Sequence, residues 1–408
     1  MTVCSGNPHS PRPAHDDSMK TMNTLPKQPV RRRLVQLLPA LALAGLSGRG
    51  QAAEPGVSGN EILVGQSITL QGGKNVYGGE AMAGVKAYID AANRSGGVNG
   101  RRIVLRTLDD ENSNTKAEAN ARALVEQGVF VLFGSIEGGP STAVMKAAVE
   151  LGVPFIGPMA GSPSLRLPYQ QLVYPVRAEH REEFRALINQ GKRIGLQRVA
   201  LLHADSDVGR EHLANVQKLA AEAGMAFGGG VPFKGDIGDE QLAAAAATLA
   251  QQKVDLVINH GSPAVYGRLI RAARAAGSRI TFWGVNSGST PLATDLGPLA
   301  KGMVFAQIVP NPNSGKTALV REYQDRMARS APGRAYSYGS LEGYMTAKAL
   351  AAALRAAGTS PTRASLMTAL ERFETDLGGL TLRWRKGEHT GCSFVDLALV
   401  GRDGRFVQ

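Results

Sequence analysis

Residues that could bind a ligand concentrate in short segments rich in Gly, Ser and Asn, each placed after an apolar run. In chain order these segments are residues 66–77, 135–141, 158–164, 204–209, 259–263 and 286–290. Where such a segment joins the carboxyl end of a strand to a helix, free amide N–H groups and the helix dipole favour an anionic ligand. The alternative is that they are tight turns with no common ligand.

Motifs for common catalytic chemistry are incomplete in this sequence. Gly315-Lys316-Thr317 resembles the end of a phosphate-binding loop, but Pro310 stands where that loop needs Gly. The dinucleotide, zinc-protease and serine-hydrolase signatures G-x-G-x-x-G, H-E-x-x-H and G-x-S-x-G are absent. We therefore expect a binding protein, not an enzyme, and no cofactor.

Asp109, Asp110 and Glu111 form a run of carboxylates directly after an apolar segment. Such a run could bind a hard cation or take part in acid–base chemistry. The more ordinary interpretation is a solvated loop whose Asn and Ser residues help to cap the next helix. We favour that interpretation.

The histidines and the cysteine outside the N-terminal segment offer little chemistry by spacing alone. His180, His203, His212 and His260 show no metal-like spacing apart from the eight residues between His203 and His212, so we expect surface or loop histidines and no metal site. Cys392 has no predicted His partner and is interpreted as a packing residue.

The elements that must position these segments alternate between strand and helix. After the strand at 62–64, the first series continues with the helix at 79–93, the strand at 103–108, the helix at 116–127, the strand at 129–133, the helix at 141–151 and the strand at 155–156. The second series has helices at 179–194 and 209–223, with strands at 199–202, 231–233, 256–258, 280–283 and 303–309. Helices at 317–328, 337–357 and 362–373 follow. This alternation predicts parallel sheets covered by helices on both faces.

Size and charge support two domains and argue against a nucleic-acid partner. The chain has 408 residues and 43% hydrophobic content, enough for two cores. Its formal net charge of +12 is concentrated partly in the first 53 positions, and aromatic residues make up only 5%. The remaining charge is spread over predicted helix faces, so we assign it to solvated surface.

The N-terminal segment reads as an export signal. Arg31-Arg32-Arg33 precedes an apolar stretch from Leu34 to Leu46, and small residues at Ala52 and Ala53 suit cleavage. We expect residues 1–53 to be a signal peptide with an N-terminal extension, exported by the general route, although the arginines also permit twin-arginine export. No Cys stands directly after the apolar stretch, so a lipoprotein is not expected. The expected location is the periplasm.

The combination of these segments resembles the type I periplasmic binding proteins, and among them the leucine/isoleucine/valine-binding proteins. The residues that carry the resemblance are Ile62-Leu63-Val64-Gly65, Gly84, Ala87, Gly96 to Gly100, Asp109-Asp110, Gly134, Gly152-Val153-Pro154, Val199 to Leu202, Asp207-Val208-Gly209, Asp255 to Ile258 and Gly302-Met303. It covers about residues 57–408. It implies the substrate-capturing component of an ABC importer.

The resemblance implies an α/β fold of two Rossmann-like lobes with parallel sheets, joined by a three-strand hinge. The N-terminal lobe would comprise 54–175 and 309–384, and the C-terminal lobe 176–308 and 385–408, with crossings near 175–176, 308–309 and 384–385. Hinge closure would trap the ligand. Expected partners are a small-molecule ligand and a membrane permease with its ATPase, with the chain a monomer. The alternative function is a periplasmic sensor that presents its closed form to a signalling protein.

Matching the family's site residue by residue gives a candidate set from both lobes. It consists of Tyr77, Glu137, Gly138, Gly139, Ser141, Met159, Ala160, Gly161, Ser162, Asp207, Val208, Ser262 and Asn286. The segments at 135–141 and 159–162 correspond to the loops that hold a ligand carboxylate. Pro140 stands where the family usually offers a hydroxyl, so Ser141 or the amides of Gly138 and Gly139 would replace it.

Asn286 marks the main departure from the family, because an acidic residue usually pairs there with the ligand's ammonium. An ammonium enclosed without a carboxylate loses several kcal/mol relative to a paired one. We therefore expect a small carboxylate without an α-ammonium, with apolar wall from Tyr77, Met159 and Val208. The competing hypothesis keeps an amino acid and assigns the negative charge to Glu137 or Asp207.

Overall fold

The computed structural model describes residues 54–235, 237–402 and 406–407. The predicted signal segment lies outside these residues, so the structure carries no information on it. No helix within the described ranges is long and apolar enough to cross a membrane.

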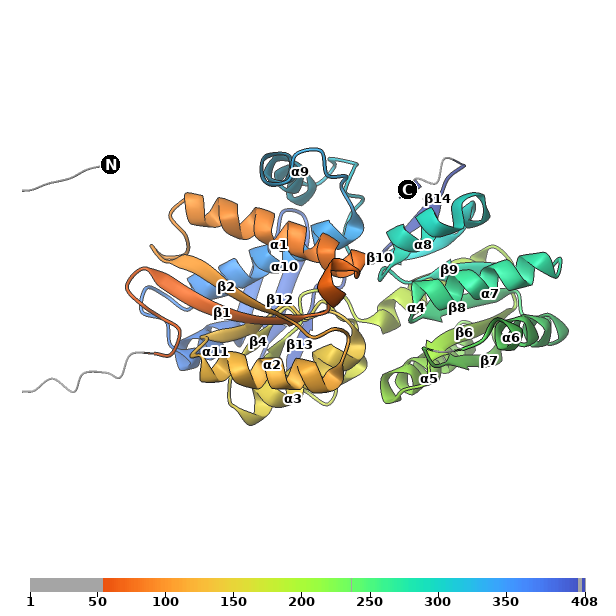
Figure 1. Ribbon diagram of the computed structural model, residues 1–408, viewed down its shortest axis with the longest axis horizontal. Helices are drawn as coiled ribbons and strands as arrows, with labels where there is room; N and C mark the ends of the chain where they lie inside the picture. The colour runs from red at the N-terminus through yellow and green to blue at the C-terminus, as the bar shows by residue number, and fades with distance from the viewer. Residues whose placement is uncertain (1–53, 236, 403–405, 408) are drawn as a thin grey trace, which may run out of the picture. The chain divides into compact units, whose positions relative to one another are not determined.

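The first sheet has five parallel strands in the order β2-β1-β3-β4-β5. The strands are β1 (Glu61–Ile68), β2 (Arg102–Asp109), β3 (Val131–Phe133), β4 (Phe155–Ile156) and β5 (Val173–Tyr174), connected through α1 (Val76–Arg94), α2 (Asn114–Glu126) and α3 (Gly138–Glu150). α1 and α10 (Tyr338–Ala356) cover one face, and α2 and α3 cover the other (Figure 1). The predicted strand–helix alternation and parallel pairing are confirmed.

α1 and α10 approach each other backbone to backbone. A Cβ added at Gly84 would lie 1.8 Å from the Ser340 carbonyl oxygen, and one added at Gly343 would lie 2.0 Å from the Ala81 carbonyl oxygen. Only glycine allows this spacing. The close approach brings Tyr77, at the start of α1, within hydrogen-bonding reach of Glu342 in α10.

The second sheet has the order β15-β14-β10-β9-β8-β6-β7. Its strands are β6 (Arg198–Ala204), β7 (Ala226–Phe233), β8 (Leu256–His260), β9 (Thr281–Gly284), β10 (Val304–Gln307), β14 (Asp396–Val400) and β15 (Phe406–Val407). One face packs against α4 (His180–Arg193) and α5 (Asp207–Glu222), and the other against α6 (Asp239–Gln251), α7 (Pro263–Ala275) and α8 (Ser289–Leu296). β14 pairs antiparallel with β10, so residues 396–400 belong to this sheet.

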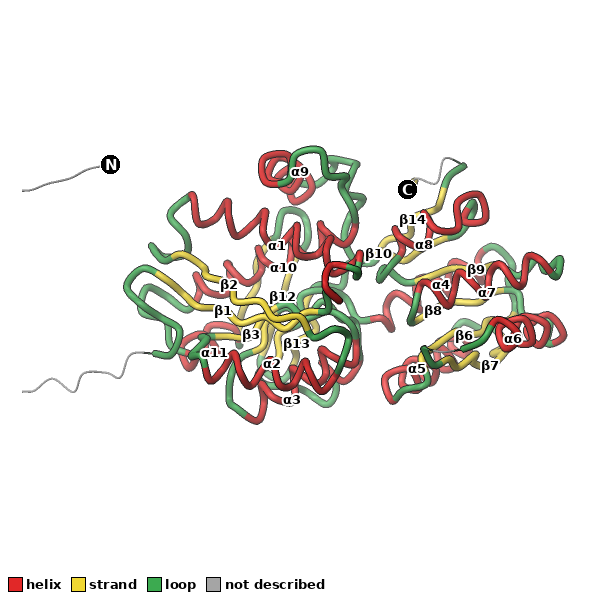
Figure 2. Tube along the Cα trace, viewed as in Figure 1, coloured by secondary structure: helices red, strands yellow, loops and turns green. Residues whose placement is uncertain are grey.

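The third sheet, β11-β12-β13, follows α9 (Ala318–Ser330), α10 and α11 (Arg363–Leu370). Its strands are β11 (Arg372–Asp376), β12 (Thr381–Arg385) and β13 (Glu388–Gly391), and they are antiparallel. The helix predicted at 362–373 ends instead at Leu370, because Phe373 pairs with Trp384 in β12 and their rings stack at 5.0 Å. Figure 2 shows helix and strand alternating from β1 to β10, after which α9, α10 and α11 follow one another and the remaining described elements are strands.

Hydrogen bonds connect the passage after β5 with the segment that leaves the third sheet. The Trp384 Nε1–H donates to the Pro175 carbonyl at 2.7 Å, and the Cys392 amide donates to the Val176 carbonyl at 2.8 Å. Cys392 is itself buried. The two-lobed α/β fold is confirmed, whereas the residue boundaries of the lobes stay a prediction.

Candidate functional site

The N-terminus of α3 brings together residues predicted from both lobes. Glu137 precedes the helix with a φ of 63°, a left-handed conformation that is uncommon for a residue with a side chain. A Cβ added at Gly138 would lie 2.7 Å from Ser162 Oγ and 3.2 Å from Val208 Cγ1. Gly138, Ser162 and Val208 are therefore neighbours around the free amides of this helix start.

Ser162 and Ser141 differ in how their hydroxyls are used. Ser162 is fully buried, and its Oγ has no hydrogen-bond partner among the described residues. Ser141 Oγ accepts a hydrogen bond from Ser135 Oγ at 2.7 Å and donates to the Ile136 carbonyl at 3.2 Å. A hydroxyl and helix amides suit a carboxylate, so Ser162 is the better candidate ligand hydroxyl.

Tyr77 and Met159 lie in one small apolar cluster with Ile68, Ala81 and Ile136. This agrees with their predicted role as apolar wall. The phenol of Tyr77 also donates a hydrogen bond of 2.5 Å to Glu342 Oε2. Burial, followed by the charge of Glu342, raises the pKa of Tyr77 well above its usual value, so the phenol stays a donor.

Asn286 lies beside two buried carboxylates that the sequence analysis missed. Its Nδ2 donates to Glu342 Oε2 at 2.9 Å, and its backbone amide donates to Glu183 Oε2 at 2.7 Å. Carboxylates from α4 and α10 therefore accompany Asn286, whereas the sequence offered only Glu137 and Asp207 for the negative charge. Asn286 Oδ1 and Glu342 Oε1 have no hydrogen-bond donor within the described part of the chain.

Arg177 supplies the positive charge of this group. Its Nη2 donates to Glu183 Oε1, and its Nη1 lies 3.6 Å from Glu342 Oε1. The side chains of Arg177, Glu183 and Glu342 are fully buried. Burial raises the pKa of both carboxyls, and Arg177 opposes that rise.

Other predicted residues do not join this group. Asp207 is exposed and pairs with Arg210 at 2.6 Å. Ser262 caps α7 by accepting a hydrogen bond from the Val265 amide at 3.3 Å. Glu137 is exposed. The two acidic residues proposed to replace the charge at position 286 are thus less well placed for that role than Glu342.

The predicted residues Ala160, Gly161 and Gly139 have no polar side-chain group that could bind a ligand. They contribute through their backbone and through the close packing that small residues allow. The Ala160 carbonyl accepts a long hydrogen bond of 3.4 Å from Arg166 Nη1. Gly161 is packed against His180, whose ring carbons lie 2.7 Å from where a Cβ would stand. A Cβ at Gly139 would lie 2.5 Å from Asn114 Oδ1. Both glycines allow close contacts that a larger residue would prevent.

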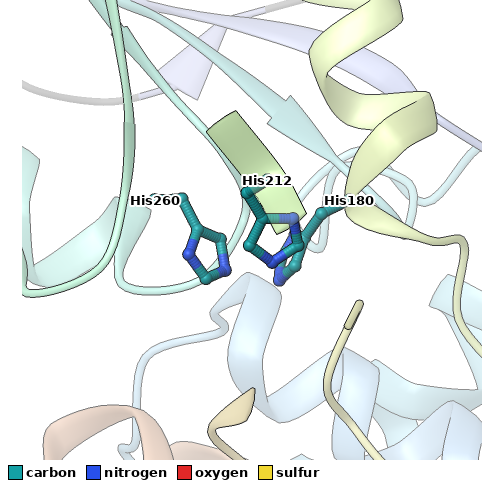
Figure 3. Close-up of side chains that lie close together, drawn as sticks. All are labelled: His180, His212 and His260. Carbon is teal, nitrogen blue, oxygen red and sulfur yellow. The ribbon is translucent and has the colours of Figure 1, made fainter. Parts of the chain in front are cut away.

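The histidines are not the surface or loop residues that the sequence predicted. His203 is 3% exposed, and His180, His212 and His260 come together from α4, α5 and the end of β8 (Figure 3). One ring nitrogen from each of these three lies within 4.8 Å of the others. Burial is the first cause that lowers the pKa of all three imidazoles well below the usual value. The sequence could not show this cluster, because the three histidines lie far apart in the chain and come together only in the fold.

The acidic run after β2 also differs from its prediction. Asp110 is fully buried and accepts hydrogen bonds from Thr69 Oγ1 at 2.6 Å and Ser67 Oγ at 3.2 Å. Asp109 accepts hydrogen bonds from the backbone amides of residues 70, 71, 72 and 111. These carboxylates organise the loop after β1, so the solvated-loop interpretation is wrong for Asp110.

Two surface hollows lie away from the predicted site. One, of about 690 Å³, is lined by residues of α4 and β14. The other, of about 290 Å³, is lined by Asp205 after β6, by Pro232 and Phe233 of β7, and by Lys234, Ile237 and Gln241. Neither hollow includes a predicted site residue. Neither gathers buried polar atoms that lack a partner in the described chain, as the surroundings of Asn286 and Glu342 do.

Comparisons with known proteins agree with the fold and with the sequence resemblance. A family model described as "Periplasmic binding protein" matches residues 61–403. The "Leu/Ile/Val-binding protein homolog 2" of Brucella abortus is 26% identical over 357 residues, covering 82% of this chain and 93% of that protein. A "Leucine-, isoleucine-, valine-, threonine-, and alanine-binding protein" of Pseudomonas aeruginosa is 25% identical, covering 67% and 71%. A substrate-binding periplasmic protein from Ralstonia solanacearum has a TM-score of 0.77 and 26% identity, covering 85% of this chain and all of that one.

Proposed function

Because this chain belongs to the periplasmic binding protein family, we propose that it captures a small carboxylate-bearing solute between two lobes and delivers it to an ABC importer. The observation that carries the proposal is the buried Ser162 hydroxyl, which has no partner in the described structure and adjoins the free amides of α3. Amides at a helix start and a hydroxyl donor bind a carboxylate well.

The surroundings of Asn286 support a solute whose other end carries hydrogen-bond donors. Asn286 Oδ1 and Glu342 Oε1 are acceptors with no donor in the described chain. Arg177 is the one guanidinium in direct contact with Glu183 and Glu342 in this group, so an added ammonium would balance the second carboxylate. This arrangement favours an α-amino acid over an acid that lacks the ammonium.

The relatives are consistent with an apolar amino acid. The Brucella protein is named as a Leu/Ile/Val-binding homologue, and the Pseudomonas protein as a binder of leucine, isoleucine, valine, threonine and alanine. Tyr77, Met159 and Val208 offer apolar surface near the α3 amides. We therefore propose leucine or a close analogue as the class of solute.

A matched pair of solutes tests this proposal. Thermal unfolding of residues 54–408 is measured with leucine and with isocaproate, which keeps the carboxylate and the apolar chain but lacks the ammonium. A solute at about 100 times its dissociation constant stabilises the protein by roughly 2.7 kcal/mol. We expect leucine to raise the unfolding temperature more than isocaproate. An equal or larger effect of isocaproate would overturn the amino-acid assignment, and no effect of either would overturn the solute class.

The substitution Glu342→Gln tests whether Glu342 contacts the ammonium group of the solute. The substitution keeps the size of the side chain and an acceptor oxygen but removes the charge, so leucine should bind about tenfold or more weakly, which corresponds to about 1.4 kcal/mol. Isocaproate binding should stay unchanged. Glu374→Gln, at an exposed residue of β11, is the control. Unchanged leucine binding by the Glu342 variant would remove Glu342 from the site.

Export to the periplasm through residues 1–53 and delivery to a permease are part of the same proposal. Uptake of labelled solute is compared between cells with and without the gene, and the processed N-terminus is sequenced. Reduced uptake in the deletion strain supports transport. Normal uptake by a strain that lacks this protein would favour the sensor alternative.

A further inference from the structure

His180, His212 and His260 form a group in the second lobe that the proposed solute site does not use. They come from the start of α4, the first half of α5 and the end of β8, and Figure 3 shows the three rings converging. The ring centroids of His212 and His260 lie 3.8 Å apart, and those of His180 and His260 lie 4.5 Å apart. Secondary structure from three separate parts of the chain therefore positions one compact set of imidazoles.

The nitrogens of this group lack ordinary protein partners. His212 is fully buried, and neither of its ring nitrogens has a hydrogen-bond partner in the described residues. His260 Nδ1 is likewise buried and unpaired in the described chain. Buried polar atoms are nearly always satisfied by protein, water or a ligand, so two adjacent histidines with such nitrogens indicate a missing partner.

The ring of His180 is contacted at Nδ1 by Glu183 and, at 3.5 Å, by Arg177 Nη2. Its Nδ1 lies 2.8 Å from Glu183 Oε1, within hydrogen-bonding distance. A ligating histidine commonly donates its second ring nitrogen to a carboxylate, which fixes the tautomer and leaves Nε2 free for the ion. Glu183 is in turn fixed by Arg177 and by the Asn286 amide.

We propose that His180, His212 and His260 hold a divalent transition-metal ion of the Zn²⁺ type. The ligand nitrogens lie within 4.8 Å of one another, and tetrahedral Zn–N bonds of about 2.0–2.1 Å place nitrogens roughly 3.4 Å apart, so the rings must rotate to bring the nitrogens closer when the ion binds. Three imidazoles select Zn²⁺, Cu²⁺ or Ni²⁺ over Mg²⁺ or Ca²⁺, which prefer oxygen ligands. The fourth position is left for water or for an added ligand.

Cobalt spectroscopy tests the site without any solute. Tag-free protein of residues 54–408 is stripped of metal and titrated with Co²⁺, and Zn²⁺ is then added. We expect intense visible d–d bands at one equivalent of Co²⁺ and their loss on addition of Zn²⁺. The variant His212→Gln should bind Co²⁺ at least about 100-fold more weakly. His389→Gln, at a buried histidine outside the cluster, should bind like the wild type.

His260→Gln provides a second variant in case the His212 variant does not fold. Absence of stoichiometric Co²⁺ binding by the wild type would overturn the proposal, as would wild-type affinity in a folded His212 or His260 variant. The leucine experiment is run with chelator present and with Zn²⁺ present. Failure of the metal titration is therefore distinguishable from failure of the proposed solute function.

Discussion

Arg177 is a buried guanidinium shared by two carboxylates, and its removal tests how the site is held together. Arg177→Met leaves Glu183 and Glu342 buried without their cation. Breaking a buried ion pair in this way usually costs about 3–5 kcal/mol. We expect a loss of that size in the free energy of unfolding, measured by urea denaturation at pH 7. A loss below about 1 kcal/mol would show that the two carboxylates do not depend on Arg177.

Ser162 should behave in the opposite way, because its hydroxyl has no partner to lose in the described chain. Ser162→Ala should leave the free energy of unfolding unchanged or raise it by up to about 1 kcal/mol, since a buried unsatisfied hydroxyl is removed. Leucine should bind several-fold more weakly by calorimetry. In contrast, Ser135→Ala removes a hydrogen bond to Ser141 and should lower stability. Full leucine affinity in Ser162→Ala would exclude the hydroxyl as a ligand group.

Sequence reasoning found some site residues and missed others for a physical reason. Tyr77, Ser162 and Asn286 follow strands or begin helices at positions that match the family's site, so the resemblance placed them in the candidate set. Glu342 lies inside a helix, where a single carboxylate is usually solvent-exposed. Its partners Tyr77 and Asn286 are 265 and 56 residues away in the chain. The available signal was that Glu342 is the one acidic residue in a helix otherwise rich in Ala, Leu, Gly and Tyr.

At the scale of elements, the contact between α1 and α10 should depend on particular glycines. Gly84→Ala places a Cβ 1.8 Å from the Ser340 carbonyl and should force the helices apart, lowering stability by about 1–3 kcal/mol. Gly79→Ala in the same helix meets only the end of Arg334, at 3.9 Å, and should stabilise by up to about 1 kcal/mol through helix propensity. Thermal unfolding of both variants gives the comparison. A destabilised Gly79 variant would contradict this account.

Asp109 makes the loop after β1 sensitive to acid. Partial burial raises its pKa, but the amides of Gly72, Leu70, Glu111 and Gln71 outweigh this and lower it to about 2. Because the folded-state pKa of Asp109 is depressed, its carboxylate stabilises the folded protein fully above the unfolded-state pKa of about 3.9. This stabilisation is lost as the pH falls through about 2. Asp109→Asn should therefore unfold more easily than the wild type at pH 7, by about 1 kcal/mol.

The pH series is the check on the Asp109 account. Thermal unfolding of the wild type and Asp109→Asn is followed from pH 7 to pH 2. We expect the difference between them to shrink below about pH 4, because the Asp109 carboxyl of the unfolded wild type, with a pKa of about 3.9, then takes up a proton before that of the folded protein does. A difference that stays constant over the whole series would mean that the charge of Asp109 does not stabilise the loop.

The helices and strands were largely predictable from the sequence. The places where their ends were predicted wrongly show what sequence patterns leave out. The apolar runs of the parallel strands and the helix caps follow local chemistry: Ser113 and Thr317, for example, cap α2 and α9 with their side chains. The segment around Phe373 was predicted as helix because its apolar spacing fits both structures. Pairing with Trp384 decides the outcome, and such nonlocal pairing is invisible to a local pattern.

At the scale of the whole molecule, the proposed capture mechanism requires the lobes to close on the solute. Saturating leucine should lower the radius of gyration of residues 54–408 in solution scattering, as expected for hinge closure. Isocaproate should have a smaller effect, in line with its weaker binding. An unchanged radius of gyration with leucine bound would mean that binding does not involve closure.

The Glu183 carboxylate connects the histidine cluster to the surroundings of Asn286 and would couple binding at the two places. One oxygen of the Glu183 carboxylate contacts His180 and Arg177, and the other accepts a hydrogen bond from the Asn286 amide. A metal ion on the histidines and a solute beside Asn286 would act on the two ends of one rigid group. By reciprocity, the factor by which metal changes solute affinity must equal the factor by which solute changes metal affinity. The protein would then report the metal status of its surroundings through how tightly it holds its solute.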